Sequence, residues 1–361
     1  MATTTIKDVA RVAGVSVATV SRVLNGLANV SAPTRERVLE VVAQLRFVPS
    51  STARSMVSRR TNTIGALLPD LHGGYFSELI RGIDLAARAR GLHLLVSSSH
   101  NDVLEAGAAL RAMNGRVDGL LVMSPHASPD FMRGNVADDL PAVLIATRAA
   151  DSRHPSLDID NRGGAFAMVR HFAERGHRRI GFIAGPADNV EAQERLHGYR
   201  AALAELGLLP ASTELEWQGD FSPASGVRAG HAIAALAAEG RLPDAVFAAN
   251  DLMAVGCLSA LAEHGLRVPH DVALAGFDGL PSSRYANPPL TTVRAPIAEL
   301  GRRALERLVG AIADPAGTAA MHQTLGVDIV ARESSAVPAS RGLKAPLFFH
   351  PLSSPAPVPE A

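Results

Sequence analysis

The sequence predicts an α/β protein with a small helix-turn-helix domain at its N-terminus, followed by a two-lobed, doubly wound core. Two observations support this prediction. Residues 5–24 hold two short amphipathic helix patterns separated by a glycine, whereas from Thr63 onward short aliphatic runs alternate with helical patterns that repeatedly end in glycine. Such alternation is typical of parallel sheets covered by helices, and a chain of 361 residues is long enough for two lobes.

The first helical pattern begins after Thr5, which can cap the helix. Its apolar residues recur at positions i, i+3, i+4 and i+7, namely Ile6, Val9, Ala10 and Ala13. Gly14 then ends the helix, and Ser16 can cap a second one. Two short helices joined by so tight a turn form a helix-turn-helix pattern.

The second helical pattern separates an inward apolar face from an outward face of small residues. The inward face consists of Val20, Val23 and Leu24, and the outward face of Val17, Ala18, Ser21 and Arg22. Small residues let a helix approach base edges in the major groove, where an arginine can donate two hydrogen bonds to guanine. The pattern favours a recognition helix over the alternative, an amphipathic hairpin that only caps a domain.

The remaining boundaries follow from local composition. A third helix is expected from about Pro33 to Leu45, and it completes a headpiece over residues 1–48. Residues 49–61 begin with a proline and contain serines that can cap a short helix, so either a hinge helix or an ordinary linker is expected there. The two-lobed core is expected over 62–334, and the Pro- and Ser-rich stretch 335–361 is expected to be a disordered tail.

Charge is distributed unevenly along the chain. It carries 35 basic and 35 acidic residues, yet residues 1–60 contain nine Lys or Arg against three acids, a local charge of 9 − 3 = +6. The remainder then carries −6, which suits a headpiece that binds phosphates and a body that the duplex repels. No apolar run approaches the ~20 residues needed to span a bilayer, and no secretory signal is visible, so a cytoplasmic, nucleoid-associated protein is expected without membrane contact.

The core sequence favours binding over catalysis. Ligands of doubly wound folds sit at the carboxyl ends of strands, which here fall near Asp70, Ser124, Arg148, Asn250 and Asp278. No phosphate-binding glycine motif follows the first strand, and no nucleophile-elbow motif is present. The acidic and histidine residues lack metal-ligand spacing, and the single cysteine, Cys257, has an apolar setting. The sequence therefore predicts no catalytic residues, no metal site and no cofactor.

These features resemble the lactose-repressor (LacI/GalR) family of bacterial transcription regulators. The resemblance covers residues 5 to about 334 and rests on motifs in the family's order: TIKDVARVAGVSVATVSRVLNG, VDGLL, ERGHRRIGFIAGP, RLHGYRAAL, AANDLMAVG, PLTTVRAP and ARESS. It implies a homodimer that represses transcription from double-stranded operator DNA, and a core that resembles periplasmic sugar-binding proteins.

The resemblance also implies roles for individual headpiece residues. Val17, Ala18 and Arg22 would read bases, and Thr5, Ser16, Thr19, Ser21 and Asn25 would contact phosphates or cap helices. Residues 50–58 would form a hinge helix that includes Ala53 and inserts Met56 into the minor groove. Met56 stands where the family usually has Leu, and Ser50 where it usually has Asn, which weakens the expected helix cap.

In the core, the resemblance implies an effector site between the lobes. Its residues would be Asp70, Tyr75, Phe76, Ser124, Arg148, Asp160, Arg195, Phe221, Asn250 and Asp278. Carboxylates, amides and arginine bind adjacent hydroxyls and aromatic faces stack on sugar rings, so a sugar or sugar derivative is expected, acting on carbohydrate-utilisation genes. Taken singly, Asp160 or Asp278 could instead be a loop cap, and Phe221 a core residue.

The resemblance leaves the effector open. Ala146 stands where relatives often have an acidic or amide residue, and His72-Gly73-Gly74 replaces the usual turn before the aromatic pair. A purine or another metabolite acting as corepressor is therefore an alternative effector. A sugar-binding transport receptor and an enzyme on the same fold are more remote alternatives.

Overall fold

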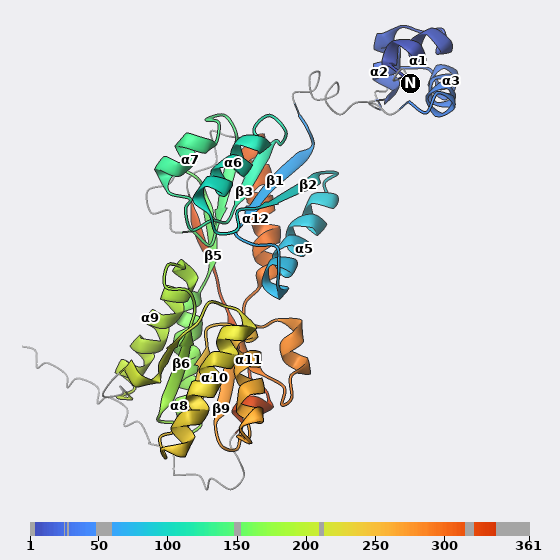
Figure 1. Ribbon diagram of the computed structural model, residues 1–361. Helices are drawn as coiled ribbons and strands as arrows, with labels where there is room; N and C mark the ends of the chain where they lie inside the picture. Colours follow the sequence, from blue (N-terminus) through green and yellow to red (C-terminus); the bar gives the residue numbers. More distant parts are fainter. Residues whose placement is uncertain are drawn as a thin grey trace, which may run out of the picture.

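The computed structural model describes residues 4–24, 26, 29–47, 60–147, 153–208, 213–314 and 321–336 (Figure 1). Four predicted site residues lie outside these ranges, namely Asn25, Ala53, Met56 and Arg148. Most of the predicted hinge and tail also lies outside them. The described residues form a three-helix domain and two lobes, each built on a six-stranded sheet.

The three-helix domain consists of α1 (Ile6–Ala13), α2 (Val17–Leu24) and α3 (Ala32–Gln44). Its small core is made of the apolar faces that the sequence predicts, and it contains Val9, Ala10, Ala13, Val20, Val23, Val38 and Val41. Gly14 ends α1 with φ 63°, a left-handed conformation in which a glycine is favoured. The domain therefore owes its fold to side chains close together in sequence.

The N-terminal lobe has the strand order β11-β5-β4-β3-β1-β2, and all of its described pairings are parallel. The strands are β1 (Thr63–Leu68), β2 (His93–Ser98), β3 (Gly119–Val122), β4 (Ala142–Ile145), β5 (Ser156–Ile159) and β11 (His322–Leu325). The helices are α5 (Gly74–Arg88), α6 (Val103–Met113), α7 (Pro129–Asn135) and α12 (Ile297–Ala313). Strands β1 to β4 match aliphatic runs that the sequence predicts as strands, whereas β5 and β11 are not predicted.

The C-terminal lobe has the order β12-β10-β9-β8-β6-β7, in which β12 pairs antiparallel with β10. The strands are β6 (Ile180–Ala184), β7 (Glu216–Gln218), β8 (Ala245–Ala248), β9 (Ala273–Asp278), β10 (Thr291–Arg294) and β12 (Asp328–Val330). The α-helices are α8 (Asn161–Glu174), α9 (Val190–Glu205), α10 (Pro223–Ala238) and α11 (Asp251–Glu263). Short 3-10 helices follow as η1 (Thr213–Leu215), η2 (Pro281–Tyr285) and η3 (Glu333–Ser335).

Ser335 belongs to this lobe, although the sequence places it in the tail. Its side chain is buried and shares hydrogen bonds with His171 Nε2 at 2.9 Å and Thr291 Oγ1 at 2.8 Å. The folded lobe therefore extends to Ser335, because the hydrogen-bond partners of this residue come from α8 and β10, which are distant in the sequence. Local composition does not reveal such partners.

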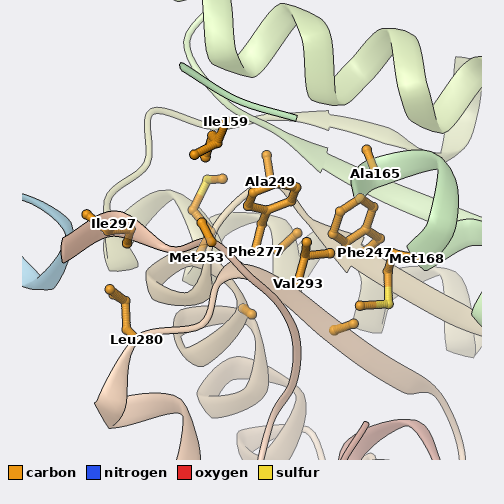
Figure 2. Close-up of a cluster of buried hydrophobic side chains, with 14 of the residues drawn as sticks. Ile159, Ala165, Met168, Phe247, Ala249, Met253, Phe277, Leu280, Val293 and Ile297 are labelled. Carbon is orange, nitrogen blue, oxygen red and sulfur yellow. The ribbon is translucent and has the colours of Figure 1, made fainter. Parts of the chain in front are cut away.

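The chain passes between the lobes three times, from β5 into α8, from β10 into α12 and from β11 into β12 (Figure 1). Two of these crossings are bonded to each other, because the Asp160 N–H donates to the Leu325 carbonyl at 2.9 Å. A continuous cluster of buried apolar side chains extends from one lobe into the other. Figure 2 shows part of this cluster, with Ile159 from β5 and Phe247 and Phe277 from β8 and β9. The lobes are thus coupled both by the backbone and by apolar packing.

Candidate DNA-binding face and effector site

The outward face of α2 is exposed and its inward face is buried, as the sequence predicts. Val17 is 41% exposed, and Ala18 and Arg22 are also exposed, whereas Val20 and Val23 are buried. Ser16 fixes the start of the helix, because its Oγ accepts a hydrogen bond from the Thr19 N–H at 3.1 Å. The helix therefore presents small side chains and one arginine to solvent, and its own N-terminus is already capped.

Thr5 is part of a polar cluster at the start of α1. The Thr5 N–H and hydroxyl both donate to the Asp8 carboxylate, at 3.0 and 2.7 Å, and Arg11 Nη2 donates to the same group at 3.1 Å. These hydrogen bonds lower the pKa of Asp8 to about 2. The cluster closes a capping box and fixes the first turn of the headpiece.

The described residues of the predicted effector set follow strand ends in both lobes or lie on helices beside them. Asp70, Ser124 and Asp160 follow β1, β3 and β5, whereas Phe221 and Asn250 follow β7 and β8 and Asp278 ends β9. Tyr75 and Phe76 lie in the first turn of α5, and Arg195 lies on α9.

The two lobes meet at the start of α5. The Tyr75 hydroxyl donates to Glu191 Oε1 on α9, at 3.3 Å, and so joins the N-terminal lobe to the C-terminal lobe. The adjacent turn is close to the C-terminal lobe too, since a Cβ on Gly74 would lie 3.1 Å from Leu280 Cδ1. A glycine at position 74 therefore permits this close approach of the lobes.

Arg195 is the centre of a buried polar cluster. It is only 2% exposed, and its Nε donates to Asn161 Oδ1 at 2.8 Å. Its Nη1 donates to the Ala249 carbonyl at 2.6 Å and to Asp278 Oδ1 at 3.1 Å. The guanidinium also lies over the Phe277 ring, 3.8 Å from its centroid. These contacts hold the arginine in one orientation, because bonds and ring contact fix its plane.

Asp278 combines an ion pair with a strained backbone. Burial and the nearby Glu191 carboxylate together raise the pKa of Asp278 to about 7, although Arg195 lowers it. Its φ is 107° and that of Phe221 is 66°, values that favour glycine. Strained residues persist only where surrounding contacts fix them, and they are frequent at binding sites.

Four other predicted effector residues also serve local structure. Asp160 caps α8 by accepting from the Gly163 N–H, and Asn250 caps α11 by accepting from the Met253 N–H, both at 2.8 Å. Asp70 accepts from two backbone N–H groups of its own turn, and Ser124 Oγ accepts from the His126 N–H. A cap and a ligand contact are compatible where a second oxygen or an amide group stays available.

Asn161 and Glu191 are not among the residues that the sequence predicts for the site. Asn161 follows the predicted Asp160, and its side chain bonds Arg195 instead of solvent. Glu191 lies four residues before Arg195 on the same helix, a spacing that places both on one face. That spacing was the signal that could have identified Glu191.

A helix-turn-helix domain followed by two parallel-sheet lobes defines a DNA-binding transcriptional regulator. Residues 5–50 match the family of bacterial regulatory proteins named for lacI, and residues 169–335 match a periplasmic binding protein-like domain. The chain belongs to the lacI family.

Relatives and solved structures agree with this membership. Catabolite control protein A of Priestia megaterium is 34% identical over 306 residues, which cover 84% of this chain and 91% of the relative. The repressor PurR of Erwinia tasmaniensis is 38% identical over 314 residues, covering 85% and 90%. A structure of the lac repressor dimer bound to operator and the anti-inducer ONPF has a TM-score of 0.82 at 30% identity, covering 92% of this chain and 99% of that one. A complex of the regulator CelR with cellobiose has a TM-score of 0.67 at 33% identity, with the same coverage.

Family membership makes this chain a transcriptional regulator and not an enzyme. Among the residues that the structure describes, no helix is long and apolar enough to cross a membrane. The same residues include no group of three or more His, Cys, Asp or Glu side chains placed to hold a metal ion.

Proposed function

We propose that this chain is a homodimeric repressor of carbohydrate-utilisation genes, controlled by a small sugar or sugar derivative bound between its lobes. The observation that carries the proposal is the buried Arg195–Asp278 pair beside a hydrogen bond that joins the two lobes. A ligand that exchanges bonds with these groups changes the contact between the lobes. A change in that contact is what couples an effector to DNA in this proposal.

The chemistry of the candidate site suits a sugar. Carboxylates accept hydrogen bonds from hydroxyl groups and Arg195 donates to hydroxyl oxygens, so adjacent hydroxyls of a sugar find partners of both kinds. Tyr75 and Phe76 at the start of α5 and Phe221 after β7 supply aromatic rings on which the C–H surface of a sugar ring can stack. The cellobiose complex of the similar regulator CelR supports a sugar as the ligand class.

A purine acting as corepressor is the second candidate. The Tyr75 and Phe76 rings lie edge to face, with centroids 5.5 Å apart, so one ring can present its face to a flat base. Several relatives of this chain are repressors named PurR, which supports a purine as the second candidate effector. A sugar is expected to act as inducer and a purine as corepressor.

The headpiece residues complete the proposal. In this proposal Val17, Ala18 and Arg22 on the exposed face of α2 read bases, and Thr5, Ser16, Thr19 and Ser21 contact phosphates or cap helices. Asn25, Ala53 and Met56 have the DNA-contacting roles that the family resemblance implies. Coupling between such sites is typically ~1–3 kcal/mol, which is about 5- to 150-fold in DNA affinity.

Thermal denaturation of the full-length protein with sugars and purines tests the effector part. A ligand that binds only the folded state raises the unfolding temperature, and the same ligand must then change operator affinity in a titration of DNA selected from a random library. Stabilisation by a sugar with weakened DNA binding supports the proposal. Stabilisation by purines alone with strengthened DNA binding favours the second candidate, and no stabilisation by either class overturns the sugar and purine assignments.

A further inference from the structure

Glu191 brings a second carboxylate to the lobe interface, beside Asp278. It occupies the first turn of α9 and is only 8% exposed. The Tyr75 hydroxyl, which belongs to the opposite lobe, donates to Glu191 Oε1 at 3.3 Å. This contact fixes the carboxylate at the point where the two lobes meet.

The interface holds two carboxyl groups, those of Glu191 and Asp278, beside one guanidinium, that of Arg195. Arg195 is one turn along α9 from Glu191, but its guanidinium is directed to Asp278, Asn161 and the Ala249 carbonyl. Burial raises the pKa of Glu191 and Arg195 lowers it, whereas Glu191 in turn raises the pKa of Asp278. The Arg195 guanidinium is therefore the nearby positive charge that stabilises the ionised form of both buried carboxyl groups.

We propose that Glu191, held by Tyr75, sets the ligand class: the effector donates hydrogen bonds through hydroxyl or amine groups and carries no phosphate or carboxylate. This inference rests on the proposed function, in which a small molecule binds between the lobes. An ionised carboxylate accepts hydrogen bonds and donates none, so Glu191 offers a hydroxyl or an amine a partner. An anion at the same place meets like charge with little solvent to screen it.

Charge-matched pairs of compounds test this proposal on the wild-type protein. Glucose is compared with glucosamine and with glucose 6-phosphate, ribose with ribose 5-phosphate, and adenosine with AMP, by thermal denaturation and then by calorimetric titration of full-length protein. We expect any pair that binds to favour the uncharged or amine member at least about tenfold. A phosphate that binds as tightly as its uncharged partner overturns the proposal.

Substitution assigns the preference to Glu191. Glu191→Gln keeps an oxygen that accepts from Tyr75 but removes the charge, so the preference for the uncharged member should fall toward unity. Glu205→Gln removes a charge from an exposed position on the same helix and should leave the preference as in wild type. A preference that Glu191→Gln does not change overturns the role of Glu191, even where the wild type rejects anions.

The test also separates this inference from the proposed function. If a phosphate compound binds the wild-type protein but not Arg195→Ala, the effector site between the lobes is supported and only the role of Glu191 is overturned. Binding by none of the compounds, in protein that still binds DNA, overturns both this inference and the sugar and purine assignments on which it rests.

Discussion

The two proposed binding surfaces, the outward face of α2 and the lobe interface, differ in how their side chains are arranged. On α2, the side chains expected to contact DNA are exposed, and the bonds that stabilise the helix lie at its capped start. At the lobe interface, Arg195 and Asp278 are buried and already paired with each other. In the proposed function, DNA therefore adds contacts to a domain that is already folded, whereas an effector exchanges contacts with an interface whose own stability depends on them.

The largest effect is expected from Arg195→Ala. Removing the guanidinium leaves the Asp278 carboxylate and the Ala249 carbonyl buried without this donor, and breaking such a pair typically costs about 3–5 kcal/mol. Urea unfolding of the full-length protein measures the loss, and effector response should disappear with it.

Arg200→Ala is the matched control on the same helix. Arg200 bonds Glu216 at 2.9 and 2.6 Å but its side chain is half exposed, so its loss should cost no more than about 1 kcal/mol. If the two variants lose the same free energy of unfolding, the buried Arg195–Asp278 pair contributes no more to stability than a surface ion pair.

The pH dependence of stability should follow Asp278. Its native pKa of about 7 lies above the ordinary value of 3.8, so the native state binds more protons than the unfolded chain between these values. Stability contributed by this group is therefore complete at low pH and is lost as pH rises toward 7. Urea unfolding at several pH values should show a steeper fall for wild type than for Asp278→Asn.

Asp220→Asn is the control for that profile. Hydrogen bonds from Ser222 and Ser225 outweigh partial burial and lower the pKa of Asp220 to about 2, so its contribution changes only at more acidic pH. Above pH ~5, the free energy of unfolding of Asp220→Asn should change with pH in parallel with that of the wild type. A profile of Asp278→Asn that also parallels wild type would contradict the assignment to Asp278.

On the DNA-binding side, Arg22→Ala should weaken specific operator binding by ~1–3 kcal/mol and relax base preference at one position in each half-site. Titration with operator and with random DNA measures both effects. Arg37→Ala is the matched control, because it removes one positive charge from an exposed position on α3, outside the recognition helix. A loss from Arg22→Ala that is equal on operator and random DNA would reduce Arg22 to a phosphate contact.

The difference between the two surfaces also explains what the sequence could predict. The headpiece helices, their caps and their buried faces depend on residues within one or two turns, and the structure confirms these features. The glycines that end core helices are confirmed as well, since Gly91, Gly176, Gly207, Gly240 and Gly265 all have positive φ. Local spacing is sufficient where the partners are local.

The missed elements depend on distant partners. Strands β5, β7, β10, β11 and β12 have three or four residues each and contain both polar and apolar side chains, so no aliphatic run marks them. Glu191 has its partner 116 residues away in the other lobe. The residues at strand ends were predictable as a group, but which of them bond each other was not, because pairing is decided by the packing of lobes.

The smallest effect is expected from Ser16→Ala. Ser16 Oγ accepts from the Thr19 N–H, and loss of such a cap costs about 1 kcal/mol of helix stability. Ser31 precedes α3, but its hydroxyl pairs with the Thr34 hydroxyl and no backbone N–H is bonded to it, so Ser31→Ala should cost less. Hydrogen exchange of the α1–α3 amides in full-length protein without DNA compares the two. Faster exchange for Ser31→Ala than for Ser16→Ala would contradict the view that the DNA-binding face depends on its own local cap.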